Sequence, residues 1–211
     1  RRPAWWLLSA AATVFMVHGH LLAVLGVVPL AVLLGLDVLR RHGADRRRAV
    51  RYALGWAALL VAGAAPVLSH ELRSGLAQTR AIVDHLGTAA AADRLTAVPV
   101  IAWRVLAAPL SGSVGTAPLV DALAVFSVVA AFVVVLAGAS IPFGRWAAAG
   151  TGWAIAALAL TAPGLVTVHP GLPNAQYHSW LDPVLFVVVG AAATWLWQSR
   201  LRSARWAAAV L

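Results

Sequence analysis

The stretch LVDALAVFSVVAAFVVVLAG occupies residues 119–138, and Asp121, near its start, is its only charged residue. An α-helix rises about 1.5 Å per residue, so about 20 apolar residues cross the roughly 30 Å hydrocarbon core of a bilayer. This stretch therefore predicts a transmembrane helix. The fold class then depends on how often such a stretch recurs along the chain.

Apolar blocks of similar length recur on both sides of this stretch. The predicted spans cover residues 4–17, 21–39, 51–69, 119–138, 146–162 and 181–198, and the first is short for a complete crossing. We predict an all-α fold, a polytopic transmembrane helical bundle of about six spans, forming a single bundle over residues 1–211. Because the chain starts at Arg1 without a methionine and ends in an apolar run, we expect a fragment of a longer protein.

The composition supports lipid as the main solvent of the chain. Hydrophobic residues make up 62% and charged residues 11%, with a mean hydropathy of +0.85, against about 45–50% and 25% in soluble domains. The absence of cysteine excludes disulfides and thiol chemistry. The formal charge of +9 comes from arginines gathered in short gaps between apolar blocks, so we expect membrane lipid, and not nucleic acid, as the partner.

The arginines also predict how the chain is oriented. Alternate gaps place residues 1–2, 40–51, 145 and 200–205 on one side, which is rich in arginine, while the other side receives only Arg73, Arg80, Arg94 and Arg104. By the positive-inside rule, the arginine-rich gaps and the C-terminal segment are cytoplasmic. Residues 70–117 then form an outer loop, in which Leu72, Leu76, Val83 and Leu86 recur at helical spacing and predict an amphipathic helix at the membrane surface.

Two outer segments carry candidate binding residues. Glu71 and Arg73 follow the third span, where Arg73 has the geometry to bind phosphate; the alternative is a helix start whose charges face water. Asp182 precedes Pro183 at the start of the last span, and an acid there is costly unless it is paired or faces water. The alternative for Asp182 is a helix cap. No metal site is predicted, because His18 and its neighbours offer no clear third ligand.

Three short strings suggest a family. PVLSHELRSG (residues 66–75), TRAIV (residues 79–83) and QYHSWLDP (residues 176–183), in this order of spans and arginine-rich turns, resemble the C-terminal membrane portion of bacterial GT-C glycosyltransferases. The similar branch is the protein-mannosyltransferase and aminoarabinose-transferase type. The resemblance covers most of the chain, but its strings are short and degenerate.

The resemblance implies transfer of a sugar from a polyprenyl-phosphate donor to an acceptor on the outer face of the bacterial cytoplasmic membrane. Such a site needs an acid to activate the acceptor and cations to hold the phosphate. The family carries its acidic motif in a first outer loop that this chain lacks, so the catalytic residues stay unknown. No cofactor is expected, and nothing in the sequence supports a divalent cation. The implied substrate-binding residues are Glu71, Arg73, His169, Tyr177, His178 and Asp182.

Two other classes stay open. A transporter or channel subunit would place polar side chains along a path at mid-membrane, whereas these spans consist mostly of alanine, valine and leucine. A non-catalytic membrane or assembly protein, or another lipid-handling enzyme, is the third possibility.

Overall fold

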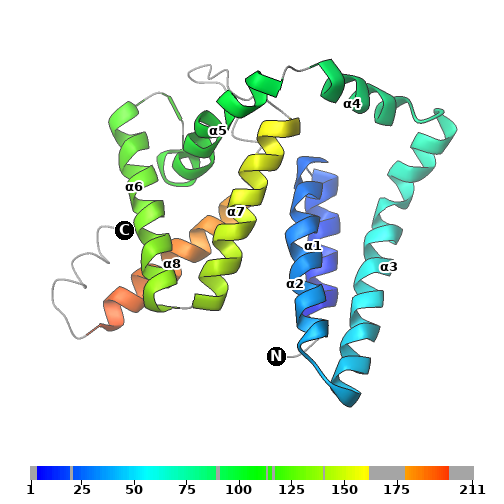
Figure 1. Ribbon diagram of the computed structural model, residues 1–211, viewed down its shortest axis with the longest axis horizontal. Helices are drawn as coiled ribbons and strands as arrows, with labels where there is room; N and C mark the ends of the chain where they lie inside the picture. Colours follow the sequence, from blue (N-terminus) through cyan, green and yellow to red (C-terminus); the bar gives the residue numbers. More distant parts are fainter. Residues whose placement is uncertain are drawn as a thin grey trace. The chain divides into compact units, whose positions relative to one another are not determined.

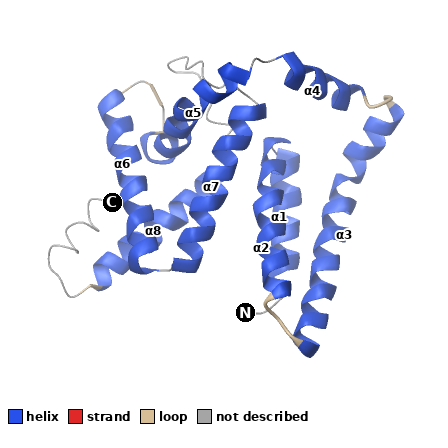
Figure 2. Cartoon of the chain, viewed as in Figure 1, coloured by secondary structure: helices blue, strands red, loops and turns tan. Residues whose placement is uncertain are grey.

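The computed structural model describes residues 4–19, 21–88, 91–112, 114–115, 117–139, 141–161 and 179–199. Every regular element among these residues is a helix, as Figure 2 shows. Contacts along the chain divide it into two compact units, unit 1 (Arg1–Ala90) and unit 2 (Ala91–Leu211). The predicted all-α fold is confirmed.

Unit 1 is built on three neighbouring helices (Figure 1). Its elements are α1 (Trp5–Gly19), the 3₁₀ turn η1 (Leu21–Gly26), α2 (Val27–Leu39), α3 (Gly43–Arg73) and α4 (Ala77–Thr88). Both α1 and α2 pack against α3, around a small core formed by Ala10, Leu34 and Trp56. Most of the remaining apolar surface of α2 and α3 is exposed, as expected for helices that lie in lipid.

Two glycines of α3 allow α1 to come close. A Cβ atom on Gly63 would lie 2.5 Å from the Cγ atoms of Val14, and one on Gly55 would lie 3.0 Å from Cδ2 of Leu7. Small residues at such contacts are typical of membrane helix pairs, because van der Waals packing holds helices together where the hydrophobic effect is absent. Unit 1 therefore depends on glycine at this helix contact.

Helix α3 extends further than the sequence indicates. The predicted third span closes near residues 66–69, whereas α3 passes through Pro66 and continues to Arg73. The imidazole Nε2 of His18 lies 2.8 Å from the carbonyl oxygen of Gly63, one turn before the proline. The backbone bond that Pro66 removes is the one to the carbonyl of residue 62, so the contact from His18 ties α1 to α3 and does not replace that bond.

Unit 2 has its core where four helices meet. Its elements are α5 (Ala91–Ser111), α6 (Pro118–Val134), the π-helical turn η2 (Val135–Ala139), α7 (Ile141–Thr161), the 3₁₀ turn η5 (Ser179–Leu181) and α8 (Asp182–Gln198). Helix α5 packs against α6 and α7, and α6 packs against α8. The core is lined by small and β-branched side chains, namely Ala131, Val135, Ala147, Val188 and Ala192.

Helix α5 lies within the predicted outer loop, residues 70–117, for most of its length. It is one helix of 21 residues that passes through Pro99 and Pro109, and it is not among the segments that are long and apolar enough to cross a membrane. One face of this helix, which includes Ile101, Arg104 and Val105, is almost completely buried. Part of the predicted outer loop is therefore packed structure within unit 2.

Among the described residues, four helical segments are long and apolar enough to cross a membrane, namely Leu22–Leu39, Gly43–Arg73, Pro118–Gly138 and Ser179–Gln198. They coincide with the second, third, fourth and sixth predicted spans, which identifies a membrane protein. The first predicted span corresponds to α1, an apolar helix of only 15 residues. The fifth corresponds to α7, where glycine, threonine and an arginine are mixed among the alanines.

Candidate functional site

The turn between α3 and α4 is organised by Glu71. After α3, Gly75 and Leu76 both adopt positive φ angles, of 66° and 63°. The backbone N–H of Leu76 donates to the carbonyl of Glu71 at 2.7 Å, which is the hydrogen bond of a Schellman turn. Leucine is rare at positive φ, so the contacts of this turn hold a residue that would not adopt this geometry by itself.

The carboxylate of Glu71 is directed at the first turn of α4. It accepts hydrogen bonds from the backbone N–H of Thr79 at 2.9 Å, from the Thr79 hydroxyl at 2.7 Å and from the backbone N–H of Gln78 at 3.3 Å. These amides belong to the helix end that carries partial positive charge. Glu71 is buried and caps α4, whereas Arg73, two residues later, is exposed.

Asp182 lies in a different environment, at the first residue of α8. The cap position of the helix is Leu181, which makes no side-chain capping hydrogen bond, so Asp182 is not the cap residue. One of its carboxylate oxygens, Oδ1, is buried and has no hydrogen-bond partner among the described residues. Such an oxygen is costly to leave unsatisfied.

Asp121 shares this feature in part. It lies in the first turn of α6 and is 2% exposed. Its Oδ2 accepts a hydrogen bond from the backbone N–H of Gly115 at 2.7 Å, while its Oδ1 is buried without a partner in the described part of the chain. Asp121 therefore ties the turn before α6 to the helix with one oxygen and leaves the other unsatisfied.

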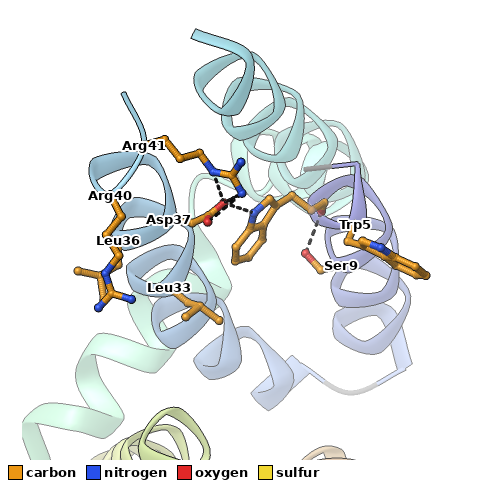
Figure 3. A pocket seen from close by; sticks show the side chains of 8 residues that line it. Trp5, Ser9, Leu33, Leu36, Asp37, Arg40 and Arg41 are labelled. Carbon is orange, nitrogen blue, oxygen red and sulfur yellow. Dashed lines mark hydrogen bonds and ion pairs between the residues drawn. The ribbon is translucent and has the colours of Figure 1, made fainter. Parts of the chain in front are cut away.

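A third aspartate, Asp37, is the centre of a cluster in unit 1 (Figure 3). Arg41 donates to both of its carboxylate oxygens, at 3.0 to 3.2 Å, and the indole N–H of Trp6 donates to Oδ2 at 3.1 Å. The start of α1 is thus tied to the end of α2. A cavity of about 410 Å³ lies beside this cluster, lined by Trp5, Trp6, Ser9, Leu33, Leu36, Asp37, Arg40 and Arg41.

The sequence indicates only part of this cluster. Asp37 and Arg41 are four residues apart on one helix face, the spacing of a helical ion pair. Trp6 is 31 residues away from Asp37, and nothing in the local pattern connects the two.

The remaining predicted binding residues, His169, Tyr177 and His178, lie outside the described residues. Within the described part of the chain, no group of three metal-ligating side chains comes together. Of the predicted site, the structure therefore brings Glu71 close to α4, leaves Arg73 exposed beside the same turn, and places Asp182 in the other unit.

No protein-family model, curated protein or solved structure matches this chain. The resemblance to GT-C glycosyltransferases stays a prediction.

Proposed function

We propose that this chain is the membrane portion of a glycosyltransferase that moves a sugar from a polyprenyl-phosphate donor to an acceptor on the outer face of a bacterial cytoplasmic membrane. The proposal starts from the resemblance of three short strings. The observation that favours it over a transport function is the position of the acidic side chains within the four membrane-spanning segments.

Acidic side chains lie only near the ends of these segments. Asp37 is in the last three residues of Leu22–Leu39, Glu71 in the last three of Gly43–Arg73, and Asp121 and Asp182 are each the fourth residue of their spans; Asp45, at the start of α3, fits the same rule. A path for ions or polar solutes needs such groups at mid-membrane. Groups at the ends are suited to chemistry on a lipid headgroup.

The topology belongs to the same proposal. With α1 and α7 as two further crossings, the chain makes about six spans. The arginine-rich link between α2 and α3 is then cytoplasmic, and the turn between α3 and α4 lies on the outer side. This arrangement directs Arg73 toward the leaflet surface from which a lipid-linked donor would be taken.

Each residue of the proposed site has a definite part. The carboxylate of Glu71 is already hydrogen-bonded to the first turn of α4. Glu71 therefore stabilises the turn and does not contact substrate. Arg73 is exposed on that turn and binds the donor phosphate, since guanidinium groups match phosphate geometry. In unit 2, Asp182, His169, Tyr177 and His178 are the residues that the resemblance implies as contacts of the acceptor or the donor. No catalytic acid is assigned within the chain.

The test is sugar transfer in membranes. The gene that encodes the chain is expressed at its full length, and transfer from radiolabelled polyprenyl-phosphate sugars is measured for wild type, Arg73→Ala and Arg47→Ala. Arg47 is the matched control, because it is an exposed arginine near the other end of the same helix. Loss of one phosphate contact should lower the rate about 10- to 100-fold in Arg73→Ala, with Arg47→Ala unchanged.

Two results would count against the proposal. Equal rates in all three proteins would remove Arg73 from the donor site. If inserted wild-type protein shows no transfer from a panel of donors but carries a polar solute across proteoliposomes, the transporter alternative replaces the proposal.

A further inference from the structure

The cavity beside Asp37 combines two kinds of surface. Leu33 and Leu36 belong to the last turns of the membrane-spanning segment Leu22–Leu39 and supply an apolar wall. Arg40 and Arg41 follow immediately and supply cations. In Figure 3, Arg40 and Leu36 lie on the same side of α2. The change from apolar to cationic lining occurs at the end of a span, which is where the headgroups of a bilayer begin.

The charges of the cavity leave it cationic. Arg41 uses Nε and Nη2 to neutralise Asp37, and the indole N–H of Trp6 further satisfies that carboxylate. The side chain of Arg40 is exposed, and its guanidinium makes no hydrogen bond or ion pair with the described residues. Two arginines against one aspartate give the lining a formal charge of +1, carried mainly by Arg40.

Tryptophan supplies a further property of a lipid site. Trp5 is 66% exposed and lines the same cavity as Trp6. Indole rings favour the boundary between hydrocarbon and headgroups, because one part of the ring is apolar and its N–H is polar. The cavity therefore presents an apolar wall, an interfacial aromatic pair and one available guanidinium in a single place.

We propose that this cavity binds one anionic phospholipid, with its headgroup phosphate on Arg40 and the start of an acyl chain against Leu33 and Leu36. A lipid fits better than a soluble phosphate ester, because four of the eight lining residues are apolar and two of these, Leu33 and Leu36, belong to a membrane span. Basic pockets between membrane helices bind anionic headgroups in this way. The site is at the end of α2, away from the turn that carries Arg73, and it does not depend on the proposed glycosyltransferase activity.

The arginine-rich link that follows strengthens the attraction for anionic lipid. Arg46, Arg47 and Arg48 lie in the first turns of α3 and are exposed. Such clusters attract any anionic membrane without forming a site. A test must therefore separate binding in the cavity from attraction by the link. For this purpose, an arginine and an aspartate of the cavity can each be compared with a residue of the same type in the first turns of α3.

The experiment measures retained lipid. Protein is purified from nanodiscs of phosphatidylcholine containing a minor fraction of phosphatidylglycerol, and native mass spectrometry gives the ratio of the two lipids that stay bound. Arg40→Ala is compared with Arg47→Ala, and Asp37→Asn with Asp45→Asn. Asp45 is an exposed acid in the first turn of α3, so each pair changes the net charge equally. Circular dichroism confirms that every variant stays helical.

We expect wild type to retain phosphatidylglycerol preferentially. Loss of one charge-assisted hydrogen bond should lower that retention about tenfold in Arg40→Ala, while Arg47→Ala, which removes a screened surface charge, changes it by less than about twofold. Asp37→Asn should raise retention because it frees Arg41, whereas Asp45→Asn should not.

Two outcomes would overturn the proposal. If the members of each pair behave alike, the protein attracts anionic lipid by its overall charge and the cavity is not a site. If soluble glycerol phosphate displaces phosphatidylglycerol from wild type, the cavity recognises a free phosphate ester and the apolar wall has no part in binding.

Discussion

Four acidic side chains, two in each unit, differ in whether all of their carboxylate oxygens have hydrogen-bond partners. In unit 1, both carboxylate oxygens of Asp37 and of Glu71 accept hydrogen bonds, from Trp6 and Arg41 in one case and from the start of α4 in the other. In unit 2, Asp121 and Asp182 each keep a buried oxygen that has no partner among the described residues.

This difference separates acids whose hydrogen bonds connect helices from acids that keep a buried oxygen able to accept a further hydrogen bond. An acid whose oxygens are all bonded contributes to stability, and removing it leaves its donors unsatisfied. An acid with an unsatisfied buried oxygen costs stability until a ligand, water or proton reaches it. The comparison therefore predicts opposite signs for the same substitution in the two units.

The largest effect should come from disrupting the close contact between α1 and α3 in unit 1. Gly63→Ala places a methyl group 2.5 Å from the side chain of Val14, which forces α1 away from α3 and disturbs the bond between His18 and the carbonyl of residue 63. Overpacking of this kind costs about 1–3 kcal/mol. Thermal unfolding in detergent measures the loss.

Gly35→Ala is the control for this change. Gly35 lies on α2 of the same unit, and a Cβ atom there meets nothing within 4 Å. Alanine is the better helix former, so Gly35→Ala should leave the melting temperature unchanged or raise it. A similar loss in both variants would show that helical glycine itself, and not the close approach of α1, sets the stability of unit 1.

The second effect concerns the tie between α1 and α2. Asp37→Asn removes the charge that Arg41 pairs with and weakens the acceptor of the Trp6 N–H. The side chains of Asp37 and Arg41 are 27% and 21% exposed, so solvent screens part of the pair and the expected loss is about 1 kcal/mol.

The third effect is local. Glu71→Gln keeps the length of the side chain but removes its charge, so the first turn of α4 loses the stabilisation of its partial positive charge. Hydrogen exchange of the Gln78 and Thr79 amides should become faster, with the rest of unit 1 unaffected. Asp84→Asn, an exposed acid later on α4, supplies the comparison; equal acceleration in both variants would mean that Glu71 is not a cap.

The spans could be predicted because length and hydropathy alone determine them. Residues 119–138 are apolar almost without interruption, and the observed segment Pro118–Gly138 differs by one residue. The end of α3 could not be predicted, since Pro66 is a strong local signal for termination and α3 passes through it to Arg73. The packing of α5 could not be predicted either, because Pro99, Pro109 and the buried Arg104 interrupt its apolar pattern.

The candidate site shows the same limit. The sequence singles out Glu71 as a charged residue at a membrane boundary, but its role depends on Gly75 and Leu76 adopting positive φ. Only that turn brings Thr79, eight residues later, onto the carboxylate. Local spacing predicts ion pairs within one helix, such as Asp37 with Arg41, and it does not predict a cap that a preceding helix provides.

The smallest effect, and the one that tests the comparison most directly, is Asp182→Asn. It makes the same chemical change as Asp37→Asn at a similar distance from the end of a span, but its buried Oδ1 has no partner to lose among the described residues. A neutral amide costs less to bury than a carboxylate, so the melting temperature should stay the same or rise. A loss as large as that of Asp37→Asn would mean that Asp182 is held as firmly as the acids of unit 1, and the two units would then not differ in how they use their carboxylates.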